Sequence, residues 1–230
     1  IHKTIENQMV LKDINLKIQS GKIYGFVGKN GSGKTMLFRL IAGLIKADEG
    51  QILIDGKQVR FNDKYPLSIG LVIENAGLYK EFTGKENLKL LASIRKVIGD
   101  DEINEAIRKV GLEPDDKRIV KKYSLGMKQR LGIAAAVMEK QDLLILDEPF
   151  NALDTSGIEM VSHLLEEEKK NGALVIFSCH DNEILKMHSD QILEFSEGRI
   201  VGKADEKEKD ISYGCDTSAR SLGDAGLAGK

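Results

Sequence analysis

Short apolar runs separated by turn residues predict that buried strands form the core of this chain. Three runs, KIYGFVG, DLLILDEP and ALVIFSCH, are typical of strands covered on both faces; they span residues 22–28, 142–149 and 173–180. The segment MVLKDINLKI, residues 9–18, alternates apolar and polar side chains and predicts a half-buried antiparallel strand. Further strands are expected in GQILIDGK, closed by an Asp-Gly turn, in IGLVIEN, and in the hairpin QILEFSEGRIV.

Helical patterns are concentrated in one part of the chain. A first helix, MLFRLIAGL, is expected to begin at Met36, and IEMVSHLLEEEKK predicts another over residues 158–170. Between residues 75 and 140, three helical segments follow one another: KENLKLLASIRKV, DEINEAIRKVGL and MKQRLGIAAAVMEK. We therefore expect one α/β domain over residues 1–205, with a core of about 1–74 and 141–205 and an all-helical insert of about 75–140.

Composition narrows the class of protein. The 230 residues carry a net charge of −2 and no Trp, so neither a basic surface nor an aromatic platform for nucleic acid is expected. No apolar run reaches the roughly 18–20 residues that cross a bilayer, and the first residues lack a secretory signal pattern, so work at a membrane would need another chain to span it. The two cysteines, Cys179 and Cys215, form no recognisable metal or disulfide motif and favour a reducing, cytoplasmic setting.

The end of the chain differs in composition from the rest. A charge run, KADEKEKD, is followed by the small and polar residues CDTSARSLGDAGLAGK. This composition predicts a flexible tail over residues 206–230, and a packed terminal segment is the alternative.

A glycine-rich segment between an expected strand and an expected helix predicts a phosphate-binding loop. It reads GKNGSGKT and matches G-x-x-x-x-G-K-[ST] at every fixed position. The glycines let successive backbone N–H groups point at a phosphate chain, and the helix adds the positive end of its dipole. We expect Lys34 to reach the β- and γ-phosphates and Thr35 to bind Mg²⁺. The nucleotide-binding residues expected here are Gly28, Asn30, Gly31, Ser32, Gly33, Lys34 and Thr35.

Two carboxylates follow the apolar strand LLIL. Asp147 would lie at the edge of the sheet, where it can hold Mg²⁺ through water, and Glu148 would face the γ-phosphate and an attacking water. A carboxylate in that position can orient and deprotonate the water, so we expect Glu148 to be catalytic. The alternative is a solvated strand end without a role in chemistry.

Several further segments resemble one family. Residues 123–130, YSLGMKQR, resemble the signature motif of the ABC (ATP-binding cassette) transporters; NALD, ending at Asp154, resembles their D-loop, and SCH, ending at His180, their switch-histidine segment. Glu74 occupies the place of their Q-loop residue. In the same order as in the family, the resemblance extends from Val10 to about Val201. It implies a P-loop NTPase core of ABC type with an antiparallel β subdomain and an inserted α-helical subdomain.

The departures from the common pattern point to a branch of this family. The signature is usually LSGGQ, but Leu125 replaces its first glycine and Met127 its glutamine, while Glu74 replaces the Q-loop glutamine. A SLGMKQR signature with glutamate in the Q-loop resembles bacterial exporters of the lantibiotic-immunity and bacitracin-resistance type. The resemblance therefore implies an exporter of drugs, peptides or lantibiotics.

The resemblance also implies a dimer with shared sites. Two such domains, identical or different, stack head to tail and trap two ATP molecules, each between the phosphate loop of one chain and Ser124 and Gly126 of the other. Ser124 can cap the helix that starts near Gly126, whose dipole would then point at the γ-phosphate. By the same resemblance, His180 is a catalytic residue that contacts the γ-phosphate, Glu74 binds nucleotide and Mg²⁺, and Asp154 belongs to the nucleotide site.

Two further expectations come from the resemblance. The family docks its membrane-spanning permease subunit on the region from Asn75 to about Lys89, where Leu78, Tyr79 and Phe82 are either a docking surface or core residues. Docking would place the chain at the inner face of the cell membrane, as a peripheral cytoplasmic subunit. An aromatic side chain usually stacks on the adenine, but its place falls near Ile5, which offers only an apolar face.

Two other functions stay open at this point. A soluble ABC-type ATPase not tied to transport usually carries long coiled-coil insertions or two cassettes, and this chain has one cassette and no long heptad run. A non-hydrolysing ABC binding module is the second alternative, and the presence of Lys34, Asp147, Glu148 and His180 argues against it.

Overall fold

A six-stranded sheet forms the centre of the structure, a computed structural model that describes residues 1–59, 61, 64–74 and 77–204. The strand order is β10-β9-β3-β8-β7-β6; neighbouring strands are parallel except β10, which pairs antiparallel with β9. The strands are β3 (Ile23–Val27), β6 (Ile69–Val72), β7 (Leu143–Leu146), β8 (Leu174–Ser178), β9 (Gln191–Ser196) and β10 (Arg199–Ala204). The predicted buried strands and the C-terminal hairpin are confirmed.

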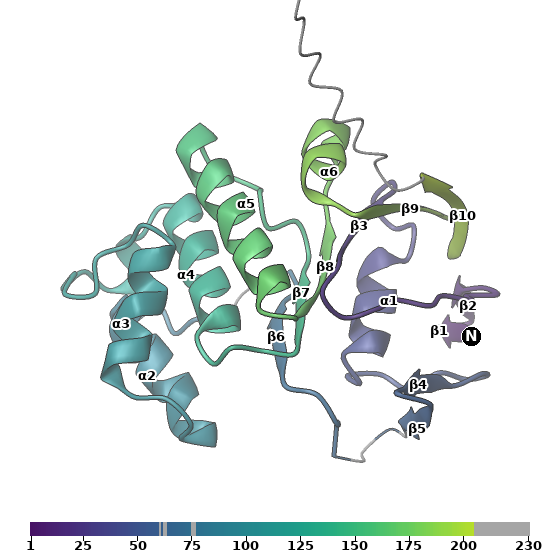
Figure 1. Cartoon of the computed structure of the whole chain (residues 1–230), viewed down its shortest axis with the longest axis horizontal. Helices are drawn as coiled ribbons and strands as arrows, with labels where there is room; N and C mark the ends of the chain where they lie inside the picture. Colours follow the sequence, from purple (N-terminus) through teal and green to yellow (C-terminus); the bar gives the residue numbers. More distant parts are fainter. Residues whose placement is uncertain (60, 62–63, 75–76, 205–230) are drawn as a thin grey trace, which may run out of the picture.

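Helices cover both faces of this sheet (Figure 1). Successive residues of β7 alternate between two hydrophobic clusters: Leu144 and Leu146 pack toward the helices α4, α5 and α6, whereas Leu143 and Ile145 pack toward α1. Burial on both faces explains why the strand is a continuous apolar run. The helices are α1 (Lys34–Ile41), α4 (Leu125–Val137), α5 (Thr155–Lys170) and α6 (Asn182–His188). Helix α1 begins two residues before the predicted Met36, and α6 was not predicted.

Two small antiparallel sheets lie beyond α1. They are formed by β1 (Lys3–Ile5) with β2 (Gln8–Leu11) and by β4 (Ile52–Ile54) with β5 (Lys57–Val59). The strand predicted over residues 9–18 is wrong beyond Leu11. The backbone turns at Asp13, which has φ 51°, while Ile14 stays buried at 5% exposure. The alternation in this segment therefore reflected burial and not strand pairing.

The predicted helices of the segment 75–140 are present. Helices α2 (Gly84–Arg95) and α3 (Asp100–Lys109) lie farthest from the sheet, and α4 lies between them and β6 and β7 (Figure 1). A short 3₁₀ turn, η1 (Val120–Lys122), leads into α4. Residues 205–230, which include the predicted tail, lie outside the described residues. None of the described helices combines the length and apolar character that crossing a bilayer requires.

The contact between β6 and α4 gives a test of this arrangement. A Cβ added to Gly70 would lie 2.0 Å from the carbonyl oxygen of Ala136, so Gly70→Ala must push the helix from the strand. We expect a loss of about 1–3 kcal/mol or more in the free energy of unfolding, measured by urea denaturation. Gly99→Ala is the control, because the nearest atom is 3.6 Å away; it should lose less than about 1 kcal/mol. Equal losses in the two variants would contradict the packing.

Candidate functional site

The phosphate-binding loop connects β3 to α1 and is enclosed by backbone from distant segments. A Cβ at Gly28 would lie 2.2 Å from the carbonyl oxygen of Phe195, and one at Gly33 would lie 2.7 Å from that of Val10. Gly33 also has φ 109°, which a residue with a side chain rarely adopts, and it is the N-cap of α1. The fixed glycines are therefore required by the space around the loop.

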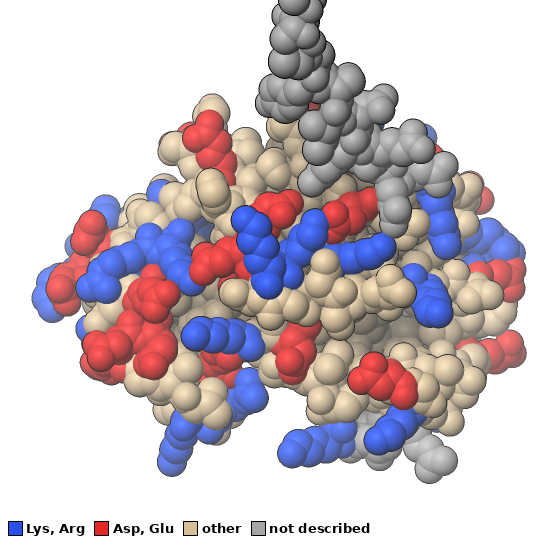
Figure 2. All heavy atoms as spheres, in the orientation of Figure 1, with Lys and Arg blue, Asp and Glu red and all other residues tan. Residues whose placement is uncertain are grey.

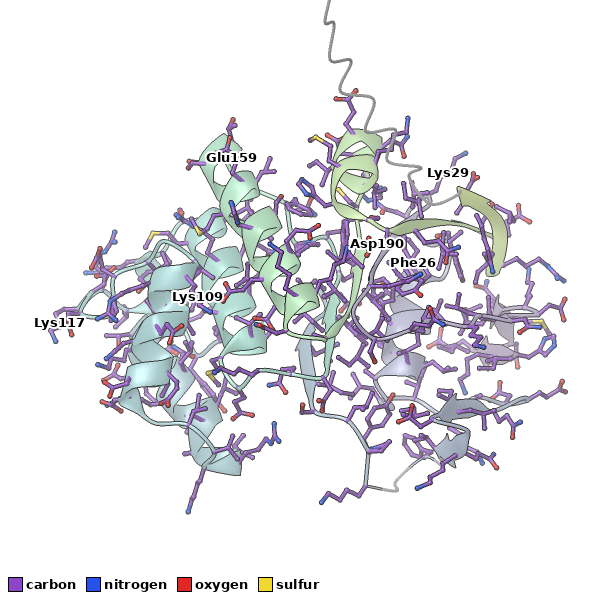
Figure 3. The ribbon with its side chains drawn as sticks, in the orientation of Figure 1. Phe26, Lys29, Lys109, Lys117, Glu159 and Asp190 are labelled. Atoms are coloured by element: carbon purple, nitrogen blue, oxygen red, sulfur yellow. The ribbon has the colours of Figure 1, made fainter. Side chains whose placement is uncertain are left out.

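Two polar side chains of the loop, Ser32 and Lys34, are buried. Lys34 is buried, at 6% exposure, and its ammonium donates hydrogen bonds to the carbonyl oxygens of Gly28 at 2.6 Å and Lys29 at 3.3 Å. The buried Oγ of Ser32 has no hydrogen-bond partner among the described residues. A buried hydroxyl without a partner is costly, and a phosphate oxygen would supply what it lacks. Figure 3 shows Phe26 in the interior and Lys29, three residues on, at the surface.

Asp147 links this loop to the neighbouring strands. Its Oδ2 accepts a hydrogen bond from Thr35 Oγ1 at 2.7 Å, and its Oδ1 accepts one from Ser178 Oγ at 2.5 Å. Its own N–H donates to the carbonyl of Val72 at 2.7 Å, which continues the pairing of β7 with β6. A hydroxyl and a carboxylate that meet in this way offer the hard oxygen ligands that Mg²⁺ prefers. No group of three or more His, Cys, Asp or Glu side chains in the described part of the chain forms another candidate metal site.

Glu148 follows in a conformation unusual for its residue type. Its φ is 52°, its N–H donates to Ser178 Oγ at 2.8 Å, and its carbonyl accepts from Gln129 Nε2 at 3.2 Å. Its carboxylate Oε1 lies 3.1 Å from His180 Nε2, an ion-pair distance, but this buried oxygen accepts no hydrogen bond from the described residues. Burial raises the pKa of the Glu148 carboxyl above its usual range, and the nearby His180 and Lys34 partly offset this.

These groups face one cavity of about 460 Å³. Residues 30–35 of the loop and both carboxylates line it, together with residues of the β1–β2 hairpin. The hairpin contributes Ile5, the position expected near the base, together with Glu6, Gln8 and Val10, which the sequence did not single out. Ser178 and Gln129 were also missed, because their partners are 30 and 19 residues away in the chain.

The remaining predicted site residues do not line this cavity. Glu74, with φ 59°, forms an ion pair with Arg39 of α1 at 2.9 Å, and its side chain is 60% exposed. Ser124 is the N-cap of α4, as predicted, and accepts from the N–H of Met127 at 3.2 Å. Asp154 caps α5 and accepts from the N–H of Gly157 at 2.9 Å.

Gly126 lies in the first turn of α4, against the turn that follows Glu148. A Cβ at Gly126 would come within 2.7 Å of the carbonyl oxygen of Ala152. Within one chain, Gly126 therefore packs on the segment that follows Glu148, and neither Ser124 nor Gly126 lines the cavity beside the phosphate loop.

The segment before α2 exposes two aromatic side chains. Tyr79 is 57% and Phe82 41% exposed, and their rings lie 5.6 Å apart, whereas Leu78 packs against the core. Of the three apolar residues noted in the sequence, two are thus exposed and one is partly buried against the core. Asn75 lies outside the described residues.

Comparisons with known proteins point to a single family. The family model described as ABC transporter matches residues 11–151. The ABC transporter ATP-binding protein YybJ of Bacillus subtilis, itself uncharacterized, is 45% identical over 86% of this chain and 91% of its own length. The lantibiotic transport ATP-binding protein SrtF of Streptococcus pyogenes is 36% identical over 87% of this chain and 86% of its own. The bacitracin transport ATP-binding protein BcrA of Enterococcus faecalis is 39% identical over 84% of this chain, but the match spans 63% of BcrA.

A solved structure has the same fold. It is the dimeric structure of a post-hydrolysis state of the ATP-binding cassette MJ0796 bound to ADP and Pi, with a TM-score of 0.78 and 24% identity. The match covers 89% of this chain and 94% of that one. At this identity the similarity supports the fold alone.

The raised pKa of Glu148 predicts how stability depends on pH. The unfolded chain loses this proton near pH 4.5, whereas the folded chain keeps it to a higher pH. The stabilisation is therefore complete below pH 4.5 and is lost as pH rises through the folded pKa. Glu148→Gln, which cannot ionise, should have a Tm above that of the unmodified protein at pH 8, and the difference should shrink as pH falls to 4.5. The control is Glu159→Gln, at an exposed position on the outer side of α5 (Figure 3), which should show no such trend in thermal unfolding. A difference in Tm between Glu148→Gln and the unmodified protein that does not change with pH would contradict the raised pKa of Glu148.

Proposed function

Because this chain belongs to the ABC transporter family, we propose that it is the ATP-binding and ATP-hydrolysing subunit that powers an ABC-type membrane transporter, an exporter of the drug, peptide or lantibiotic class. The observation that carries this proposal is the convergence of Lys34, the Thr35–Asp147 pair and Glu148 on one cavity. The relatives named for bacitracin and lantibiotic transport support the class of cargo.

Each group in the cavity has a role in hydrolysis that its chemistry allows. The loop N–H groups, Ser32 and Lys34 would bind the phosphates, and Lys34 would exchange its contacts with loop carbonyls for contacts with phosphate oxygens. Thr35 and Asp147 would hold Mg²⁺, which supplies positive charge against the phosphates when bound. Glu74, now paired with Arg39, would have to leave this ion pair to reach the metal.

Glu148 is the proposed general base. Its Oε1, which accepts no hydrogen bond from the described residues, can accept a proton from an attacking water, and its raised pKa brings its basicity closer to that needed at neutral pH. His180, beside the same oxygen, would contact the γ-phosphate. Ile5 in the wall of the cavity would cover the base without aromatic stacking, so that the phosphates supply most of the affinity.

The assembly that we propose needs two kinds of partner. Ser124, Gly126 and Asp154 lie outside the cavity of their own chain, which supports a second ABC domain that receives them. The exposed Tyr79 and Phe82 support docking of a membrane-spanning permease subunit on the segment before α2. The chain would then lie at the inner face of the membrane, bound through that subunit.

The two alternative functions have less support. A catalytically inactive module would have no reason to keep a buried carboxylate next to a phosphate loop. For an ATPase that acts on nucleic acid we would expect a basic face. On the face shown in Figure 2, basic and acidic side chains are interspersed, and no large basic patch stands out.

The role of Glu148 predicts separate effects on binding and chemistry. Glu148→Gln should bind ATP normally but lose about 10²- to 10⁴-fold in hydrolysis, and it should accumulate an ATP-bound dimer. Lys34→Ala should weaken ATP binding itself. Equilibrium binding of a fluorescent ATP analogue and a phosphate-release assay measure the two effects. Near-normal turnover in Glu148→Gln would rule out the general base, and unchanged affinity in Lys34→Ala would remove the phosphate role.

Shared sites predict a gain of activity on mixing two inactive variants. Mixed dimers of Lys34→Ala and Ser124→Arg chains hold one intact site, formed by the Lys34 of one chain and the Ser124 of the other. The mixture should therefore hydrolyse ATP faster than either variant alone. The control is a mixture of Lys34→Ala with Glu148→Gln, in which both sites are damaged, and it should regain nothing. Activity that stays linear in enzyme concentration at high dilution, without dimers, would contradict the shared site.

A further inference from the structure

Ser178 is a wholly buried polar residue at the carboxyl end of β8. Its exposure is 0%, and it lies between the ends of the two strands that carry the proposed chemistry, β7 and β3. The last paired residues of β7 and β8 are Leu146 and Phe177, so Ser178 stands beside Asp147, one residue beyond the ladder. A polar side chain in this place needs hydrogen bonds to offset the loss of water.

The hydroxyl of Ser178 makes two hydrogen bonds, one as donor and one as acceptor. Its single proton goes to Asp147 Oδ1 at 2.5 Å, and its oxygen accepts the N–H of Glu148 at 2.8 Å. Among side chains of this size, only a hydroxyl can both donate and accept a strong hydrogen bond. One atom thus holds the side chain of Asp147 and the backbone of Glu148.

The two bonds orient both carboxylates. With Oδ1 held by Ser178, Asp147 turns its other oxygen, Oδ2, to Thr35, 2.7 Å away. The N–H of Glu148 cannot pair with a strand neighbour, because the chain turns at φ 52°, and the hydroxyl takes the place of the missing carbonyl. Without it, an acceptor on Asp147 and a buried donor on Glu148 would each lose a partner.

We propose that Ser178 is a positioning residue for metal-dependent hydrolysis, in which its hydroxyl holds Asp147 in the orientation that binds Mg²⁺ and fixes the backbone from which Glu148 reaches the cavity. This inference rests on the proposed function and assigns a role in it to a further residue. Groups that orient metal ligands typically contribute 10- to 100-fold in metal affinity or activity.

The test measures metal binding directly in the full chain. Mn²⁺ is titrated by electron paramagnetic resonance in the presence of a non-hydrolysable ATP analogue, and the Mg²⁺ dependence of ATP hydrolysis is measured in parallel. Ser178→Ala should weaken Mn²⁺ binding by about 10- to 100-fold and raise the half-saturating Mg²⁺ concentration accordingly. Binding of the analogue without metal should stay unchanged.

Two further variants separate positioning from packing. Ser178→Thr keeps the hydroxyl and suits a strand, so it should bind Mn²⁺ within about threefold of the unmodified protein. Ser162→Ala removes another buried hydroxyl, which donates to the Ile158 carbonyl at 2.7 Å in α5; it should change thermal stability but not Mn²⁺ binding.

The outcomes are distinct. Unchanged Mn²⁺ affinity in Ser178→Ala, or a Thr variant as weak as the Ala variant, would overturn the role of the hydroxyl. If Ser178→Ala fails to fold, Ser178→Cys replaces it, since a thiol is a poor donor; weaker Mn²⁺ binding supports the proposal and unchanged binding overturns it. If the unmodified protein binds neither the analogue nor Mn²⁺ with it, the proposed function itself fails.

Discussion

The close approach of backbone to the phosphate-binding loop is the constraint on which the rest of the site depends. No side chain fits at Gly28 or Gly33, because carbonyl oxygens of β9 and β2 lie within 2.7 Å of where a Cβ would be. The loop is also tied down by the N–H of Gly198, which donates to the carbonyl of Ser32 at 2.8 Å. The order of the sheet, which sets β9 beside β3, and the hairpin β1–β2 thus enforce one shape on the loop. That shape directs α1 and its first side chains into the cavity.

Parallel strands supply the second half of the site. Because β7, β8 and β3 run the same way, their carboxyl ends bring Asp147, Ser178 and the start of the loop to one edge of the sheet. This is the usual place for ligands in open α/β sheets. Burial is what leaves Ser32 and Glu148 with unused hydrogen-bonding capacity and raises the pKa of the Glu148 carboxyl. The absence of a partner that makes these two buried atoms costly to the fold leaves them able to bond to a ligand in the cavity.

Much of this arrangement could be predicted from the sequence where chemistry or burial fixes the residue types. The buried runs ending at Leu146 and Ser178 predicted strands because both faces of the sheet are covered. The strand predicted over residues 9–18 was wrong from residue 12 on, because Ile14 is buried there without pairing in a strand. The contacts that the backbone carbonyls of Val10 and Phe195 make with the loop could not be predicted, because they do not depend on the identity of a side chain. The hydrogen bonds of Ser178 and Gln129 could not be predicted either, because their partners are distant in the sequence and meet them only in the folded chain. The ion pair of Glu74 with Arg39 could not be predicted either, because it depends on how α1 and the end of β6 meet.

The left-handed backbone of Glu148 sets two selective pressures against each other. A side chain at φ 52° costs roughly 1–2 kcal/mol relative to ordinary conformations, and glycine or asparagine would tolerate this position better. Selection for a stable fold and selection for the role that we propose for Glu148 in hydrolysis therefore act in opposite directions at this position. In a descendant of this gene freed from the need to turn over nucleotide, position 148 is therefore one at which we expect glycine or asparagine to replace glutamate.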